Sequence, residues 1–175
     1  NGFFEMAGVG EKNTEVLRVI DKWDKIGAEN VQQLLLEECG LSKQCTEKII
    51  AFLENNGDAA RVAKALDELS GQNALFDQGA EELKTVIRYM EQFGVPAQAY
   101  TVDLTIARGL DYYTGTVYET LMLDHPQIGS ICSGGRYDNL AAYYTDKPLP
   151  GVGISIGLTR LFYVLSEQGY LNDDA

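Results

Sequence analysis

The chain has 175 residues, which suits one medium domain or two small ones. An apolar fraction of 45% supports a hydrophobic core and argues against disorder. Acidic residues outnumber basic ones by 26 to 14, and no basic run could neutralise several phosphates of a polynucleotide. This segment alone should therefore bind nucleic acid poorly.

The cysteines Cys39, Cys45 and Cys132 are odd in number and lack zinc-type spacing, which favours reduced thiols and a cytoplasmic location. The chain begins at Asn1 without an initiator methionine and continues directly into an apolar segment. We therefore expect a fragment of a longer protein. There is no signal peptide and no apolar run long enough to span a bilayer, so no membrane association is expected.

Helical periodicity dominates residues 14–93. Ser42 and Asp58 are expected to cap the N-termini of two successive helices, and Gly57 suits the C′ position of the first. The first of these helices should bury Cys45, Ile49, Phe52 and Leu53, and the second Val62, Ala65, Leu66 and Leu69.

Gly79 is expected to precede a further helix, which Gly94 and Pro96 terminate. One apolar stripe of this helix is expected in the core, formed by Leu83, Val86, Ile87, Met90 and Phe93. None of these residue types calls for a ligand.

The period changes from 3.6 to 2 after Pro96. Residues 100–106 alternate between apolar and polar side chains, which predicts a half-buried strand. Residues 116–123 predict a second strand. A turn separates it from a third strand near residues 128–133, so these two should form an antiparallel hairpin.

Gly151–Ile156 predicts a further strand that continues into a helix from about Leu158 to Gln168. Leu158, Leu161, Phe162 and Leu165 should form the apolar stripe of this helix, with Gly169 at its C′ position. The fold class is therefore α+β, with a helical module followed by an antiparallel sheet and a boundary at residues 94–98.

Three arginines of the second half lie beside or within glycine-rich segments: Arg108, Arg136 and Arg160. Glycine lets a backbone approach a ligand closely, and a guanidinium group offers a planar fork to carboxylate or phosphate. We therefore predict that the three guanidinium groups converge on one pocket for an anionic small molecule.

The same three segments resemble motifs of a known family. Residues 107–115 (ARGLDYYTG) resemble the first histidine-specific motif of histidyl-tRNA synthetases, and residues 133–140 (SGGRYDNL) resemble the second. Residues 150–162 resemble motif 3 of class II aminoacyl-tRNA synthetases. Residues 19–26 (VIDKWDKI) are similar to the start of the family's helical insertion.

The resemblance implies a domain organisation. Residues 1–96 would form the helical insertion module, with the end of a preceding catalytic-domain segment at 1–12. Residues 97–175 would be the C-terminal part of the class II catalytic core, including part of its antiparallel sheet and the motif 3 helix.

The resemblance also implies a reaction, in which the histidine carboxylate attacks the α-phosphate of ATP and the histidyl group then passes to tRNA(His). Arg108 would be the catalytic residue, contacting both the α-phosphate and the carboxylate. Arg160 and Gly153 would bind ATP together with Arg108. The histidine-binding residues would be Arg108, Tyr112, Tyr113, Tyr137, Gly134 and Gly135.

Other polar residues are given lesser roles. Asp111 and Asp138 would orient neighbouring arginines or backbone rather than contact substrate. His125, the only histidine of the chain, is expected in a solvated loop. No residue of the chain is predicted to bind a metal, although ATP in this family arrives with Mg²⁺.

Motifs 1 and 2 of the family are not found in this sequence. Because motif 1 builds the family's homodimer, we expect the fragment to be monomeric or weakly associated, and inactive on its own. Two alternatives stay open. One is a non-charging, synthetase-like regulatory protein such as the ATP phosphoribosyltransferase regulatory subunit; the intact Arg108 argues against it. The other is a helical module that docks tRNA, which its acidic charge disfavours.

Overall fold

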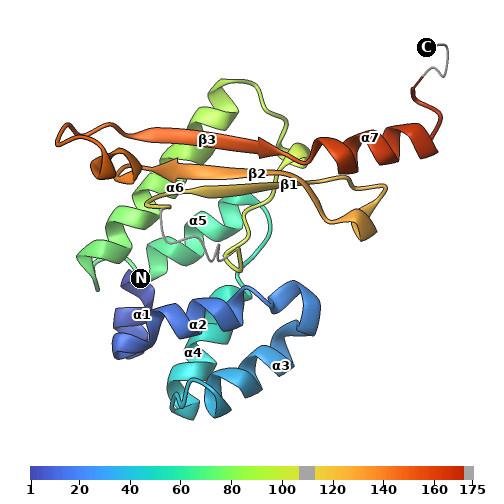
Figure 1. The fold of residues 1–175 in the computed structure, drawn as a ribbon. Helices are drawn as coiled ribbons and strands as arrows, with labels where there is room; N and C mark the ends of the chain where they lie inside the picture. The colour runs from blue at the N-terminus through green and yellow to red at the C-terminus, as the bar shows by residue number, and fades with distance from the viewer. Residues whose placement is uncertain (107–112, 172–175) are drawn as a thin grey trace. The chain divides into compact units, whose positions relative to one another are not determined.

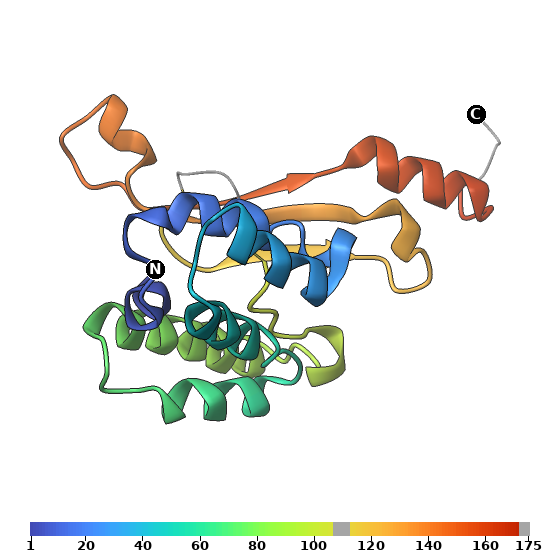
Figure 2. The ribbon, with the colours of Figure 1, turned by 90° about the horizontal axis from the view of Figure 1, so that it is seen from below.

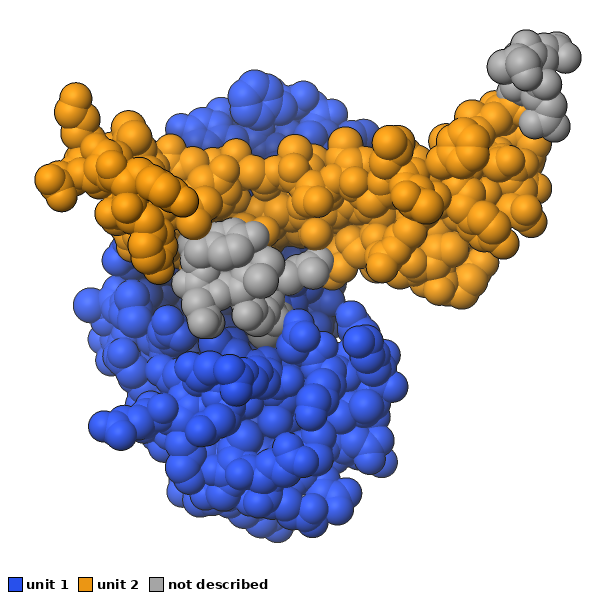
Figure 3. All heavy atoms as spheres, viewed as in Figure 1, with its two compact units in different colours: residues 1–109 blue, residues 110–175 orange. Residues whose placement is uncertain are grey.

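The computed structural model describes residues 1–106 and 113–171 (Figure 1). Its contacts divide the chain into two compact units, Asn1–Gly109 and Leu110–Ala175, coloured separately in Figure 3. Each unit is described by itself below. Among the described residues, no helix combines the length and the apolar character needed to cross a bilayer.

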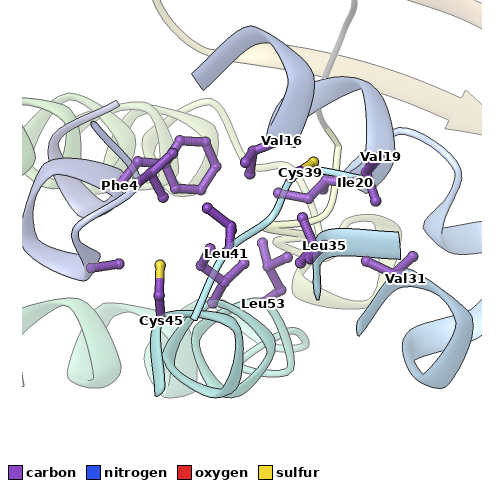
Figure 4. Close-up of a cluster of buried hydrophobic side chains, with 13 residues drawn as sticks. Phe4, Val16, Val19, Ile20, Val31, Leu35, Cys39, Leu41, Cys45 and Leu53 are labelled. Atoms are coloured by element: carbon purple, nitrogen blue, oxygen red, sulfur yellow. The ribbon is translucent and has the colours of Figure 1, made fainter. Parts of the chain in front are cut away.

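The first unit is helical. Its elements are α1 (Gly2–Ala7), η1 (Gly10–Lys12), α2 (Asn13–Ile20), α3 (Trp23–Glu37), α4 (Lys43–Leu53), α5 (Ala59–Glu68), α6 (Ala74–Gln92) and η2 (Ala97–Ala99). Side chains from α1 to α4 meet in one buried cluster, shown in Figure 4, where Phe4, Val16 and Leu35 lie among them. A second cluster joins α5 and α6. Phe3, Phe52 and Leu104 pack against both clusters, so the two cores are continuous.

Both predicted N-caps are confirmed. The Ser42 hydroxyl accepts a hydrogen bond from the Cys45 amide at 3.2 Å, and the Asp58 carboxylate accepts one from the Arg61 amide at 2.9 Å. Each satisfies a backbone donor that the first turn of a helix leaves without an intrahelical partner. The local sequence signal was sufficient because a cap involves only residues close in the chain.

The expected start of the last long helix at Gly79 was wrong. Helix α6 begins at Ala74, and the Asn73 side chain caps it by accepting from the Phe76 amide at 2.9 Å. Gly79 lies inside the helix, where a glycine costs only about 1 kcal/mol relative to alanine. Burial of Phe76 and Ala80 in the second cluster outweighs that cost.

The strand expected at residues 100–106 is also absent. This segment makes a single bridge, between Val102 and Gly57, and Val102 is buried in the second cluster of the helical unit. The Thr101 hydroxyl donates to the Gly57 carbonyl at 2.8 Å, and the Leu104 amide donates to the Asn56 side chain at 2.8 Å. The alternation did not identify one buried face, because Val102 is buried on the apolar side and Thr105 on the polar side. Within residues 1–106 and 113–171, this segment makes no strand pairing beyond that bridge.

These contacts also correct the expectation for Gly57. Helix α4 ends at Leu53, so Gly57 is not its C′ residue. Gly57 instead pairs with Val102, in a positive-φ conformation of 133°. By their contacts, residues 97–106 belong to the helical unit. The predicted boundary at residue 96 between the insertion module and the catalytic core stays a prediction.

Two predicted apolar stripes are only partly buried. On α6, Ile87 is buried but Phe93 is 86% exposed. On α7 (Leu158–Glu167), none of the four predicted residues is fully buried, and the one buried side chain is that of Val164, which the prediction did not include. Leu158 and Phe162 are exposed. Periodicity identified both helices, but it did not identify the buried side of α7.

The second unit contains a three-stranded antiparallel sheet in the order β1 (Val117–Leu121), β2 (Ser130–Tyr137) and β3 (Gly151–Ile156). Figures 1 and 2 show β2 between the other two strands. The short helices η3 (Pro126–Ile128) and η4 (Leu140–Tyr143) lie in the connections. The predicted hairpin, β3 and α7 are confirmed, and Gly169 follows the C-cap of α7 at a φ of 68°.

Thr46 provides a test of core energetics. Its side chain is fully buried in α4, and its hydroxyl oxygen has no hydrogen-bond partner. Burying an unpaired hydroxyl costs about 1–3 kcal/mol. We expect Thr46→Val, which keeps the shape, to raise the free energy of unfolding by about 1 kcal/mol. Urea denaturation followed by the fluorescence of Trp23, the only tryptophan, measures this. A less stable variant would show that the hydroxyl is hydrogen-bonded in solution.

Candidate functional site

The register of the sheet assigns each residue of β2 to one of two faces. Gly135 pairs with Val117 and Gly153, while Gly134 pairs with Tyr118 and Ile154. Because successive side chains of a strand point to opposite faces, Gly134 and Gly135 do not share a face.

Three glycines, Gly135, Gly151 and Gly153, form a surface that we call the glycine floor. The Tyr137 ring lies against two of them. A Cβ atom added to Gly153 would stand 2.9 Å from a Tyr137 ring carbon, and one added to Gly151 would overlap the same ring. Only glycine lets the ring lie this close to the strand.

Tyr113 covers the rest of this floor. A Cβ atom on Gly135 would be 2.8 and 2.9 Å from two carbons of the Tyr113 ring. Tyr113 and Tyr137 therefore lie on the same face, and Gly135 and Gly153 lie directly opposite each other between β2 and β3. The two rings thus cover the three glycines, and their hydroxyl groups give this face polar sites that suit a small ligand with a flat polar ring.

A row of polar residues adjoins the glycine floor on the same face. Glu119, Ser133 and Ser155 are in register across the three strands, and we call them the polar row. The row offers one carboxylate and two hydroxyl groups. Glu119 was not among the predicted site residues, although a carboxylate in the middle of the apolar and β-branched strand predicted at 116–123 was a usable signal.

Gly134 serves the opposite face. The Tyr118 side chain lies over Gly134, and its hydroxyl donates a hydrogen bond of 2.6 Å to the Gly153 carbonyl. A Cβ atom on Gly134 would overlap that carbonyl oxygen and would stand 2.5 Å from the Tyr118 hydroxyl. Burial raises the pKa of Tyr118, which keeps the hydroxyl protonated as a donor.

Arg136 and Arg160 do not converge, so the predicted three-arginine pocket was wrong for this pair. Arg136 Nε contacts the Asp138 carboxylate at 3.0 Å, whereas Arg160 Nη1 donates to the Ser130 carbonyl at 2.8 Å. Ser130 and Arg136 are six residues apart on β2, or about 20 Å in an extended strand. The sequence showed two arginines in glycine-rich segments but not the strand that separates them.

Three residues that the sequence assigned to the site, Arg108, Asp111 and Tyr112, lie outside the described residues. His125 lies in the connection between β1 and β2, at the start of η3, as expected for a loop residue. Among residues 1–106 and 113–171, no three histidine, cysteine or carboxylate side chains gather as metal ligands.

Comparison with known proteins identifies the family. A profile of the family described as Histidyl-tRNA synthetase matches residues 4–161. The histidine–tRNA ligase of Clostridium tetani is 54% identical over 175 residues, covering 100% of this chain and 39% of that protein. The chain belongs to the histidyl-tRNA synthetase family. The corresponding ligase of Xanthomonas campestris pv. campestris (strain 8004) is 53% identical over 177 residues, covering 97% of this chain and 37% of the ligase.

Solved structures agree with this family and with the α+β fold class. The crystal structure of histidyl-tRNA synthetase from Nostoc sp. PCC 7120 matches with a TM-score of 0.89 at 44% identity, over 98% of this chain and 40% of that one. A Bacillus halodurans protein, described as an ATP phosphoribosyltransferase regulatory subunit/histidyl-tRNA synthetase, matches with a TM-score of 0.74 at 21% identity, over 94% and 41%. The latter shows the fold alone. The chain spans about 40% of the length of the family members it matches.

Proposed function

We propose that this chain is part of a class II ligase that activates histidine with ATP and transfers the histidyl group to tRNA(His). The observation that supports it most directly is the glycine floor with the rings of Tyr113 and Tyr137 against it. Each tyrosine belongs to one of the two segments that resemble the histidine-specific motifs, and their rings lie against glycines of the same face. In the proposal the imidazole of histidine lies between these rings, where a tyrosine hydroxyl can meet a ring nitrogen.

The reaction requires that two anions be held together. The histidine carboxylate attacks the α-phosphorus of ATP, a P–O bond forms, and pyrophosphate leaves. Arg108 would contact both the carboxylate and the α-phosphate, which offsets their repulsion, and alignment with charge stabilisation would supply most of the catalysis. The histidyl-adenylate, a mixed anhydride, then passes its histidyl group to a terminal hydroxyl of the tRNA, which forms an ester and releases AMP.

Arg160 would bind the terminal phosphates of ATP. Its guanidinium has five N–H donors, and one of them bonds to the Ser130 carbonyl, which fixes the side chain at the opposite end of β2 from Tyr137. ATP would therefore extend along β2 from the glycine floor toward Ser130. Gly153 and the polar row lie along that path.

Magnesium would arrive with ATP. Mg²⁺ usually binds one or two carboxylates together with substrate phosphates. Glu119, with the hydroxyl groups of Ser133 and Ser155 beside it, provides oxygen donors of this kind. When bound, the ion would offset negative charge on the phosphates.

The test uses the full-length gene product and residues 1–175 alone. We expect the full-length protein, as a homodimer in the cytoplasm, to charge tRNA(His) and to catalyse histidine-dependent ATP–pyrophosphate exchange. We expect residues 1–175 alone to show no exchange above background, because they span only 37–39% of the matched ligases. A full-length protein that binds histidine but does not charge tRNA would instead support the regulatory alternative. Exchange by residues 1–175 would contradict the predicted inactivity of the fragment.

A further inference from the structure

Thr114 and Asp138 are joined by two hydrogen bonds between segments 24 residues apart in sequence. The Thr114 hydroxyl donates to the Asp138 carboxylate at 2.8 Å and accepts from the Asp138 amide at 2.9 Å. One hydroxyl group thus fixes both the side chain and the backbone of Asp138.

Arg136 completes the arrangement. Its Nε atom donates to the two carboxylate oxygens of Asp138 at 3.0 and 3.2 Å. Its carbonyl accepts from the Thr114 amide at 3.0 Å, and its amide donates to the Thr116 carbonyl at 3.0 Å. The Arg136 side chain lies across Gly115, where an added Cβ atom would be 3.0–3.4 Å from three of its carbons. We call Thr114, Gly115, Arg136 and Asp138 the clamp.

The clamp connects directly to the glycine floor. Thr114 follows Tyr113 in the chain, and Arg136 follows Gly135. Joining Thr114 to the Arg136 segment therefore brings the Tyr113 ring against Gly135, so close that a Cβ atom added to Gly135 would be 2.8 Å from a ring carbon. Arg136 itself is on the opposite face from Tyr137, so its side chain does not belong to that wall of the site.

We propose that the clamp is a positioning device that sets the Tyr113 ring, and with it the affinity for histidine, and that Thr114 and Asp138 are its key residues. The proposal rests on the proposed function for the identity of the ligand. A purely stabilising role fits the geometry poorly. The Arg136 and Asp138 side chains are 53% and 35% exposed, and ion pairs this accessible to water contribute little to stability.

Three substitutions in the full-length gene product test the clamp. Thr114→Val keeps the branched shape but removes both hydroxyl hydrogen bonds. Asp138→Ala removes the carboxylate that accepts one of them and that contacts Arg136. Thr114→Ser retains the hydroxyl group. The matched control is Thr120→Val, an exposed threonine on β1 outside the clamp. The Kd for histidine and the Kd for ATP are measured by calorimetry, with Tm recorded for each variant.

We expect Thr114→Val and Asp138→Ala to raise the Kd for histidine about tenfold, because each variant loses at least one hydrogen bond that holds the Tyr113 segment in place. The Kd for ATP should stay within about twofold, Thr114→Ser should restore histidine affinity, and Thr120→Val should match wild type. A folded Thr114→Val variant with unchanged Kd for histidine would overturn the proposal. A parallel loss of histidine binding, ATP binding and Tm would also overturn it, since that pattern indicates a structural role.

Failure of the clamp and failure of the proposed function can be told apart. If the wild-type protein charges tRNA and the Thr114→Val variant binds histidine normally, the clamp proposal is wrong and the proposed function stands. If the wild-type protein binds histidine without charging tRNA, the proposed function is wrong, and the histidine Kd values of the variants still test the clamp proposal. If the wild-type protein neither binds histidine nor charges tRNA, both proposals are wrong.

Discussion

Gly134→Ala is expected to unpair β2 from β3. The new Cβ atom would overlap the Gly153 carbonyl oxygen. This oxygen belongs to the backbone of β3, so it cannot move without disrupting the pairing of Gly134 with Ile154 and of Gly135 with Gly153. It would also displace the Tyr118 hydroxyl from its hydrogen bond to the same carbonyl. Overpacking together with the lost hydrogen bond should cost about 3–4 kcal/mol.

Hydrogen–deuterium exchange of the β2 and β3 amides measures this loss in the 175-residue chain. The matched control is Gly157→Ala, where the nearest atom to the new Cβ, the Ile131 carbonyl oxygen, is at an ordinary 3.4 Å. The control should lose no more than about 1 kcal/mol, because Gly157 is the N-cap of α7 and glycine is preferred to alanine there. Trp23 fluorescence reports the helical unit and should be the same in both variants. Wild-type protection in Gly134→Ala would rule out the close approach of the two strands.

Val102→Asp is expected to destabilise the helical unit by about 3–5 kcal/mol, because it removes a buried valine and places an unpaired carboxylate in an apolar cluster. Val102 is 8% exposed and follows the expected domain boundary at residue 96. A large effect would show that the helical unit needs residues beyond that boundary.

The control for this experiment is Val152→Asp, the same substitution at a residue of β3 that is 69% exposed. Urea denaturation followed by Trp23 fluorescence should show a marked loss of stability for Val102→Asp. For Val152→Asp, the helical unit should change by no more than about 0.5 kcal/mol. Equal midpoints for the two variants would mean that Val102 contributes nothing to the helical core.

Features set by neighbouring residues could be predicted from the sequence. The caps at Ser42 and Asp58 depend on a side chain reaching an amide three residues away. The bounds of β3 and the following helix depend on a change of period and on Gly169. In each case the deciding interaction lies within one or two turns of the chain.

The site was harder to predict because its geometry depends on register. The glycines at 134 and 135 appeared to share a floor, and the third strand was expected to end near residue 133. Strand β2 instead continues to Tyr137, and this continuation places Gly134 and Arg136 on one face and Gly135 and Tyr137 on the other. A difference of a few residues in strand length therefore decides which side chains can meet.

The separation of Arg136 from Arg160 has a similar origin. Arg136 directly follows Gly135, and Arg160 lies three residues after Gly157, so both arginines belong to glycine-rich segments that look alike in composition. Their distance is set by the length of β2, at whose ends they bond to Asp138 and to the Ser130 carbonyl. Pairing between distant segments has no local signature, so it could not be read from either segment alone.

The outer side of β3 has a consequence for handling the isolated chain. Val152, Ile154 and Ile156 are 69%, 64% and 58% exposed, and among the described residues no strand pairs with the edge of β3 away from β2. Such an edge is a template for stacking between molecules. A formal net charge of −12 opposes this at neutral pH through mutual repulsion, which vanishes near the isoelectric point of about 4.4. Colloidal stability of this polypeptide therefore depends on its acidity, so mildly alkaline, low-salt buffers suit it best.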